Sequence, residues 1–397
     1  MKAFVITALL CGAMLRVSAQ QEFQKKFQRQ FIEAANESVI LLPEGTFNLQ
    51  GSLWLDDKKD VIIRGAGMDR TILNFGSQLS GAEGLKITNA ARITIQDLTV
   101  QNTIGDGIKA QMVEGITLMN VKAEWTDGAD KKNGGYGLYP VQCTNVLIDG
   151  CTARGASDAG IYVGQSRFII VRNSKAYENV AGIEIENSLY ADVYGNEVYN
   201  NTGGILVFDL PDLIQKKGGY VRVFRNIIRD NNHNNFAPRG NIVGKVPPGT
   251  GLMILATNHL EAFDNKITNN ITAGTAIISY YITENPINDA AYDPFPANIY
   301  IHDNEYNRPR VRATGKGRMG KMYRFKLRFG KDVPHIIYDG IEDEKKVERN
   351  ICIRNNEGQS FANIDADGGF KKITRDASLH DCMRQPLDEV VFSTKAE

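Results

Sequence analysis

The sequence predicts an all-β fold, a single right-handed parallel β-helix with a helical cap at its N-terminal end. Two observations support this: a Gly followed by an apolar residue recurs about every 22 residues, and short β-type runs recur at a second place in the same unit. A unit this short holds two or three strands and cannot bury an apolar face alone, so stacked units must share one core. The repeated pairs are Gly84-Leu85, Gly107-Ile108, Gly137-Leu138, Gly160-Ile161, Gly182-Ile183, Gly204-Ile205 and Gly251-Leu252, with Gly274-Thr275 as a weaker member.

The β-type runs have apolar outer positions, as expected when one face of a strand is buried. Asparagines follow them at a fixed turn position, with Cys151 and Ser174 in the same place in earlier units, and a second set follows a few residues later. Asn tolerates left-handed backbone geometry, and stacked amides can bond along the axis. A β-propeller needs longer units, and no recurring helix supports a leucine-rich repeat. The runs begin at Ile93, Ile116, Val146, Ile169, Val221 and Ile299; the two asparagine sets are Asn196, Asn226, Asn265 and Asn304, and Asn201, Asn232 and Asn270.

The N-terminus is typical of an exported protein. We predict a signal peptide over residues 1–19, in which Lys2 precedes an apolar stretch too short to span a bilayer and Ala19 ends a small-residue cleavage site. The expected location is therefore the periplasm or the outside of the cell, and no other segment is apolar enough for a membrane span. Such compartments permit disulfides; Cys352–Cys382 is the preferred pair, and free buried thiols are the alternative.

The mature chain divides into three parts. Apolar residues at helical spacing predict a capping helix over residues 20–38, which covers the first coil. The β-helix is expected over residues 39–304, and residues 305–397 are expected to form a last coil and an irregular C-terminal cap. The 46 basic and 46 acidic side chains balance, which argues against a nucleic-acid partner.

The opening coil carries a recognisable pattern. The segments Leu42-Pro43-Glu44-Gly45-Thr46-Phe47 and Ile63-Arg64-Gly65-Ala66-Gly67 resemble the usual opening of the pectin-lyase-like superfamily of secreted right-handed β-helices. More narrowly, the segments 203–211, 234–240 and 247–251 resemble the bacterial parallel β-helix repeat family of exported proteins. That resemblance implies a polysaccharide as partner for the wider superfamily. It also implies a second exported protein encoded nearby for the narrower family.

Candidate site residues come from strand alternation. The residue after each repeated apolar position is expected to face solvent. This row includes Lys109, Tyr139, Tyr162 and Glu184, and the position two residues further includes Glu186 and Phe208. Tyr139 and Tyr162 would form a platform on which sugar rings stack. Each residue alone is also an ordinary solvent-facing strand residue.

Two long insertions are expected to form walls around this row. The first, between Lys122 and Gly137, contains Trp125, a further substrate-binding candidate. The second, between Phe208 and Gly251, contains His233, Arg239 and Lys245. His233 in an Asn-rich loop is equally well explained as a residue that satisfies backbone groups.

The candidate chemistry is uronate β-elimination or C5-epimerisation. Arg239, Lys245 or Lys109 would neutralise the sugar carboxylate, and His233, Tyr162 or a lysine would exchange the C5 proton. The set of catalytic candidates is therefore His233, Arg239, Lys245, Tyr162 and Lys109; the substrate-binding candidates are Tyr139, Tyr162, Glu184, Glu186, Trp125 and Phe208.

The sequence contains no recurring nonapeptide Ca²⁺ repeat, so it defines no cofactor. Ca²⁺ is conceivable through Glu184, Glu186, Asp158 and Asp106, because it prefers hard oxygen ligands. Glycoside hydrolysis is the weaker enzyme hypothesis, since paired carboxylate motifs are missing. The alternative from a different class is a non-catalytic glycan-binding or surface scaffold protein.

Overall fold

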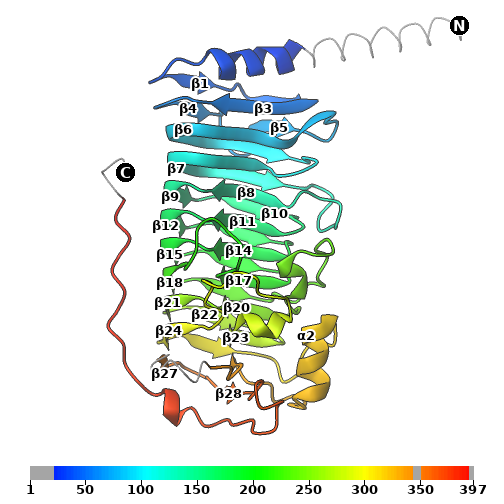
Figure 1. Cartoon of the computed structure of the whole chain (residues 1–397). Helices are drawn as coiled ribbons and strands as arrows, with labels where there is room; N and C mark the ends of the chain where they lie inside the picture. Colours follow the sequence, from blue (N-terminus) through cyan, green and yellow to red (C-terminus); the bar gives the residue numbers. More distant parts are fainter. Residues whose placement is uncertain (1–21, 343–349, 393–397) are drawn as a thin grey trace, which may run out of the picture.

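The computed structural model describes residues 22–342 and 350–392, which wind into a right-handed parallel β-helix (Figure 1). Each coil passes through three sheets, and every strand pairs in parallel with its counterparts in the coils before and after it. The predicted fold class is therefore confirmed. The first sheet contains β3 (Gly51–Asp56), β8 (Tyr136–Val141), β11 (Ala159–Gly164), β14 (Ala181–Glu186), β17 (Gly203–Phe208), β20 (Thr250–Leu255), β23 (Ala273–Ile278), β26 (Ile336–Tyr338) and β28 (Phe361–Asn363).

The other two sheets close the coil. The second sheet contains β1 (Val39–Leu41), β4 (Ile62–Arg64), β9 (Thr144–Asp149), β12 (Arg167–Arg172), β15 (Leu189–Tyr194), β18 (Gly219–Phe224), β21 (Asn258–Phe263), β24 (Ala297–His302) and β27 (Ile351–Arg354). The third contains β2 (Gly45–Asn48), β5 (Thr71–Asn74), β10 (Thr152–Arg154), β13 (Lys175–Tyr177), β16 (Glu197–Tyr199), β19 (Ile227–Arg229), β22 (Lys266–Thr268) and β25 (Glu305–Asn307). The long strands β6 (Ser80–Gln101) and β7 (Ile108–Glu124) bend through all three sheets.

The repeated glycines mark where successive coils approach most closely. A Cβ at Gly107 would lie 2.5 Å from the carbonyl oxygen of Gly137, and one at Gly137 would lie 2.5 Å from that of Gly160. Real Cβ atoms do not approach this closely, so these positions admit only Gly. The adjoining apolar residues point inward and form one continuous core along the axis.

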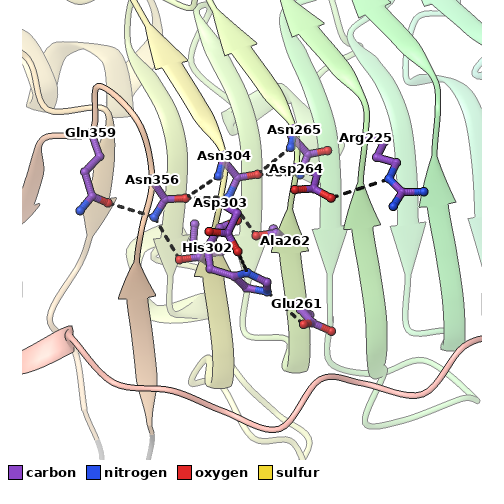
Figure 2. Close-up of polar contacts among 11 residues, drawn as sticks. Arg225, Glu261, Ala262, Asp264, Asn265, His302, Asp303, Asn304, Asn356 and Gln359 are labelled. Carbon is purple, nitrogen blue, oxygen red and sulfur yellow. Dashed lines mark hydrogen bonds and ion pairs between the residues drawn. The ribbon is translucent and has the colours of Figure 1, made fainter.

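Asparagine ladders hold the coils in register, and Figure 2 shows part of one of them, Asn265, Asn304 and Asn356. The side-chain N–H of Asn226 donates to Oδ1 of Asn265 at 3.0 Å, and the side-chain N–H of Asn265 donates to Oδ1 of Asn304 at 2.9 Å. The left-handed residue is the one before each ladder asparagine, such as Asp264 at φ 53°, and not the asparagine itself as expected. That bend aims the amide inward, where it bonds to the coils on both sides.

The second ladder corrects one residue of the sequence prediction. Asn201 bonds to Asn231, at 3.0 Å, and Asn231 bonds to Asn270, at 3.2 Å. Asn232 was expected in this ladder, but its side chain is partly exposed and its Oδ1 accepts the backbone N–H of Ile271 at 3.0 Å.

Short helices lie outside the coils. Residues 22–33 form the N-terminal helix, and Phe27 and Phe31 of this helix are fully buried over the first coil. The ring of Phe27 lies 5.1 Å from that of Phe47. The predicted capping helix is therefore present, whereas residues 1–19, the predicted signal peptide, lie outside the described residues. The remaining helices are η1 (Ile242–Lys245), η2 (Tyr280–Thr283), α2 (Gly317–Lys321), η3 (Met322–Lys326) and η4 (Ser378–His380).

The C-terminal segment returns along the outside of the second sheet as an extended strap, residues 383–392 (Figure 1). Cys352 and Cys382 form a disulfide at the start of the strap, as preferred from the sequence, and Cys143 and Cys151 are free and buried. The strap then bonds to the coils: the guanidinium of Arg384 donates 2.7 Å to Asn298. In the described part of the chain, no helix is both long and apolar enough to cross a membrane.

Candidate functional site

The outward row predicted on the first sheet is in register. Trp54 pairs with Lys86, Lys86 with Lys109, and Lys109 with Tyr139. In the following coils Tyr162 pairs with Glu184, and Glu184 with Leu206. Side chains from separate coils therefore line up along the axis of the helix, as the repeat spacing predicts.

The later half of this row is buried, which corrects the expectation that it faces solvent. Tyr162, Glu184, Glu186 and Phe208 have exposed fractions of 4%, 1%, 8% and 2%. Tyr162 and Phe208 belong to a second apolar cluster outside the coil, completed by residues such as Val243 of the second insertion. The apolar outward residues of later coils require such a cover, so the insertion packs down on the sheet and does not form an open wall.

The earlier half of the row remains accessible. Trp54 is 49% exposed. Nζ of Lys86 lies 6.0 Å from the ring centroid of Trp54, and Nζ of Lys109 lies 4.8 Å from the ring centroid of Tyr139. Glu83 contacts both cations, with its Oε1 3.4 Å from Nζ of Lys86 and 4.0 Å from Nζ of Lys109. We call Trp54, Lys86, Lys109 and Tyr139 the open row.

Three tyrosines close the open row at its buried end. The ring centroids of Tyr136 and Tyr139 are 4.4 Å apart, and that of Tyr162 lies 4.6 Å from Tyr136 and 5.0 Å from Tyr139. The interplanar angle between Tyr139 and Tyr162 is 80°, so these two rings do not lie side by side as one stacking surface. Tyr139 and Tyr162 pack edge to face, an arrangement that aromatic pairs favour, whereas the ring of Tyr136 is tilted against both.

Carboxyl groups collect behind the tyrosines. The hydroxyl of Tyr162 donates 2.7 Å to Glu186, and the amide of Asn241 in the second insertion donates 2.6 Å to Asp158. Neither oxygen of Glu184 has a hydrogen-bond partner in the described structure. Burial raises the pKa of Asp158 to about 7 and holds the pKa values of Glu184 and Glu186 above their usual range.

Asp106 is the carboxyl group of this set that lies toward the open row, where the charge of Lys109 acts on it. It lies in the turn before β7, is only partly buried, and its Oδ1 accepts the backbone N–H of Tyr136 at 3.3 Å. Burial raises the pKa of Asp106 to about 6, against the opposing attraction of Lys109. At neutral pH this carboxyl group is therefore mostly ionised and able to accept a proton.

The remaining predicted residues lie elsewhere. Trp125 is 5% exposed and donates from Nε1 to the carbonyl of Thr103 at 2.8 Å, so it anchors the first insertion and does not face a ligand. His233 contacts the backbone oxygen of Asn234, and Arg239 is exposed. Lys245 bonds to the carbonyl oxygen of Thr283. The structure therefore does not bring the three predicted catalytic residues of the second insertion to the row.

Sequence reasoning missed Trp54, Tyr136 and Asn241. Trp54 precedes the first repeated Gly, so the repeat spacing did not reach it, although its strand alternation places it in the same row. Tyr136 directly precedes the repeated Gly137, and Asn241 is placed by the fold of its insertion.

The Ca²⁺ hypothesis has no support in the geometry. Among the described residues, no group of three or more His, Cys, Asp or Glu side chains could hold a metal ion. This finding includes Glu184, Glu186, Asp158 and Asp106, the four carboxyl groups from which a Ca²⁺ site was expected.

Comparison with known proteins agrees with this architecture. The family model described as a right handed beta helix region matches residues 83–210 and 130–287, which together span just over half of the chain. The chain belongs to this right-handed β-helix family. A search of curated proteins found no match to this sequence.

Solved structures with related coils include the A-module of a mannuronan C-5 epimerase from Azotobacter vinelandii, with 14% identity, a TM-score of 0.47, and coverage of 87% of this chain and 91% of that chain. A pectate lyase shows 12% identity, a TM-score of 0.45, and coverage of 94% and 84%. A bacteriophage Phi29 gene product 12 fragment shows 14% identity, a TM-score of 0.45, and coverage of 72% and 54%. These similarities concern the coiled fold.

Proposed function

We propose that the protein binds a carboxylated polysaccharide along the open row. The observation that supports this is the alignment of Trp54, Lys86, Lys109 and Tyr139 in successive coils. With about 4.8 Å between coils, Trp54 and Tyr139 stand roughly 14 Å apart, enough for several sugar units. The aromatic side chains offer stacking surface, and the two lysines offer charge for uronate groups.

The finer proposal is uronate β-elimination at the Tyr139 end of the open row. Lys109 neutralises the sugar carboxylate, and Asp106 takes the C5 proton. The released electron pair forms the C4–C5 double bond as the C4–O bond breaks, and the departing oxygen takes a proton from the hydroxyl of Tyr139. Burial raises the pKa of Tyr139, which keeps that hydroxyl protonated at neutral pH. If a proton returns to C5 from the opposite face before that bond breaks, the same groups carry out epimerisation.

Export fits this function. A polysaccharide outside the cell is reached only by a protein that leaves the cytoplasm, and the Cys352–Cys382 disulfide is of the kind that persists in oxidising compartments. We therefore propose a periplasmic or secreted location.

The test separates binding from turnover. The purified chain is incubated with alginate, pectate and ulvan, and both retention on immobilised polysaccharide and the ultraviolet absorbance of unsaturated product are measured. We expect Lys109→Met and Trp54→Ala to weaken binding, whereas Lys175→Met, on an exposed lysine of the third sheet, leaves it unchanged. Equal binding by all four proteins would refute the open row as the site.

A non-catalytic glycan-binding protein is the second candidate. It is favoured by the positions of His233 and Arg239, which the structure leaves outside the row. Binding without unsaturated product, and without a change in uronate stereochemistry measured by NMR, would decide for this alternative.

A further inference from the structure

A cavity of about 550 Å³ lies among the second insertion, the segment between β23 and β24, and the segments that follow β25. It is lined by η1, by η2 and the residue after it, by α2 and η3, and by residues near Phe370. This volume falls within the range of small-molecule sites. The cavity is a separate feature, because none of its lining residues belongs to the open row.

The wall of the cavity has an apolar part. Tyr281, Met322, Phe325 and Phe370 line it, and Tyr281 and Phe325 are 48% and 65% exposed. Large apolar side chains left exposed around a cavity are typical of a surface that a ligand covers.

The polar part of the wall is mostly cationic. Lys245, Arg318, Lys321 and Lys326 line the cavity, and Glu284 is the one carboxylate among its described lining residues. Arg318 pairs with Glu284. Within the part of the chain that the structure describes, no carboxylate forms an ion pair with Lys321 or Lys326, and Nζ of Lys326 lies 4.8 Å from the ring centroid of Phe370.

Lys245 also experiences this excess of positive charge. Burial, followed by repulsion from Arg318, lowers the pKa of Lys245. Its ammonium group donates to the carbonyl oxygen of Thr283, which fixes it at the wall. An anion bound here would relieve the repulsion between the two cations.

From these features we infer that the cavity binds a small organic anion with an apolar body, such as an aromatic or aliphatic carboxylate. The carboxylate pairs with Lys321 and Lys326, and the apolar body packs against Met322, Phe325 and Phe370. This binding site does not rest on the proposed polysaccharide function.

The experiment compares two probes of the same shape and different charge. Binding of 2-naphthoate and of 2-naphthalenemethanol to the full chain is measured by calorimetry. We expect the anion to bind at least about tenfold more tightly than the alcohol, since one charge-assisted hydrogen bond accounts for that factor. Equal affinity of the two probes, or no binding of either, would overturn the inference.

Matched variants locate the site. Lys321→Ala/Lys326→Ala should weaken naphthoate binding by about tenfold or more and leave the alcohol unaffected. Lys371→Ala/Lys372→Ala removes the same charge from exposed positions outside the cavity and should change neither affinity. Circular dichroism and Tm confirm that both variants are folded. An equal loss in both variants would assign the binding to general attraction and refute the site.

Discussion

The hydroxyl of Tyr162 reaches along its strand and donates 2.7 Å to Oε1 of Glu186 in the next coil. Gly164 pairs with Glu186, and a side chain at Gly164 would collide with the ring of Tyr162. The bond therefore depends on a glycine that leaves room for the ring. The sequence predicts that both residues face solvent, but in the structure both side chains are buried.

Replacing Tyr162 by Phe should lower the free energy of unfolding by about 1–3 kcal/mol, because it leaves a buried carboxyl group without its donor. The hydrogen bond from Tyr162 lowers the pKa of Glu186 against the opposing effect of burial, so its loss should raise that pKa further. Urea unfolding at several pH values measures both effects, and the loss should grow as pH rises. Tyr190→Phe, at a partly exposed ring, is the matched control; equal losses would contradict the prediction.

Glu184→Gln should reduce the loss of stability at high pH. Burial raises the pKa of Glu184 in the folded chain, so the folded state holds the proton more tightly than the unfolded state. The stabilising contribution is fully present below the usual pKa of 4.5 and is lost as pH rises through the folded pKa. The neutral amide does not titrate, so the variant should lose less stability than the native protein between about pH 5 and pH 9.

The check for Glu184→Gln is the urea midpoint at both ends of that pH interval. Glu305→Gln, at a partly exposed residue paired with Lys266, serves as the control. A native protein whose stability rises over this interval, with Glu184→Gln following the same curve, would contradict the assignment.

If turnover occurs, its rate should follow the ionisation of Asp106. The base must be deprotonated, and the pKa of Asp106 is raised to about 6, so kcat/KM should rise as pH increases through about 6. Asp106→Asn should abolish product formation while polysaccharide binding at neutral pH persists. The steady-state rate between pH 4 and pH 8, measured with the polysaccharide that binds best, is the test. A rate that falls through this interval would exclude Asp106 as the base.

Buried ladder amides should contribute far more to stability than their exposed neighbours. Asn231→Ala leaves the buried backbone N–H of Asn201 without its acceptor, and such an unsatisfied group costs about 1–3 kcal/mol. The side-chain amide of Asn201 also loses one of its acceptors but keeps the carbonyl oxygen of Ala176. Asn232→Ala removes a partly exposed amide and should cost about 1 kcal/mol or less. Thermal unfolding of the two variants under identical conditions provides the comparison. A larger loss at Asn232 than at Asn231 would contradict the ladder.

The sequence could predict the periodic parts of this molecule and not the parts that depend on the insertions. The outward row follows from a strand period of two and a coil period of about 22, so the alignment of Lys86, Lys109 and Tyr139 was accessible from spacing alone. The burial of Glu184 was not, because it depends on how the second insertion packs on Leu206 and its neighbours. No local pattern encodes that contact. The prediction that Asn232 belongs to the second ladder was wrong for a related reason, because the ladder residue Asn231 lies where the same insertion begins to depart from the repeat.

The strap should detach when the disulfide is reduced. Cys382 ties the strap to Cys352 of β27, and beyond it the strap is held by a few polar contacts, such as the N–H of Leu387 with Glu261 at 2.9 Å. Hydrogen bonds of this kind are individually worth about 1 kcal/mol, so without the covalent link the strap should exchange between bound and free states. Trypsin should then cut after Arg384 much faster in reduced protein and in Cys382→Ser than in native protein. Cys143 and Cys151 are buried and burial raises the pKa values of their thiols to about 12, so mild reduction should make Cys352 and Cys382 reactive and leave Cys143 and Cys151 unmodified. Cleavage at Arg384 that proceeds equally fast before and after reduction would show that the strap is free in the native protein.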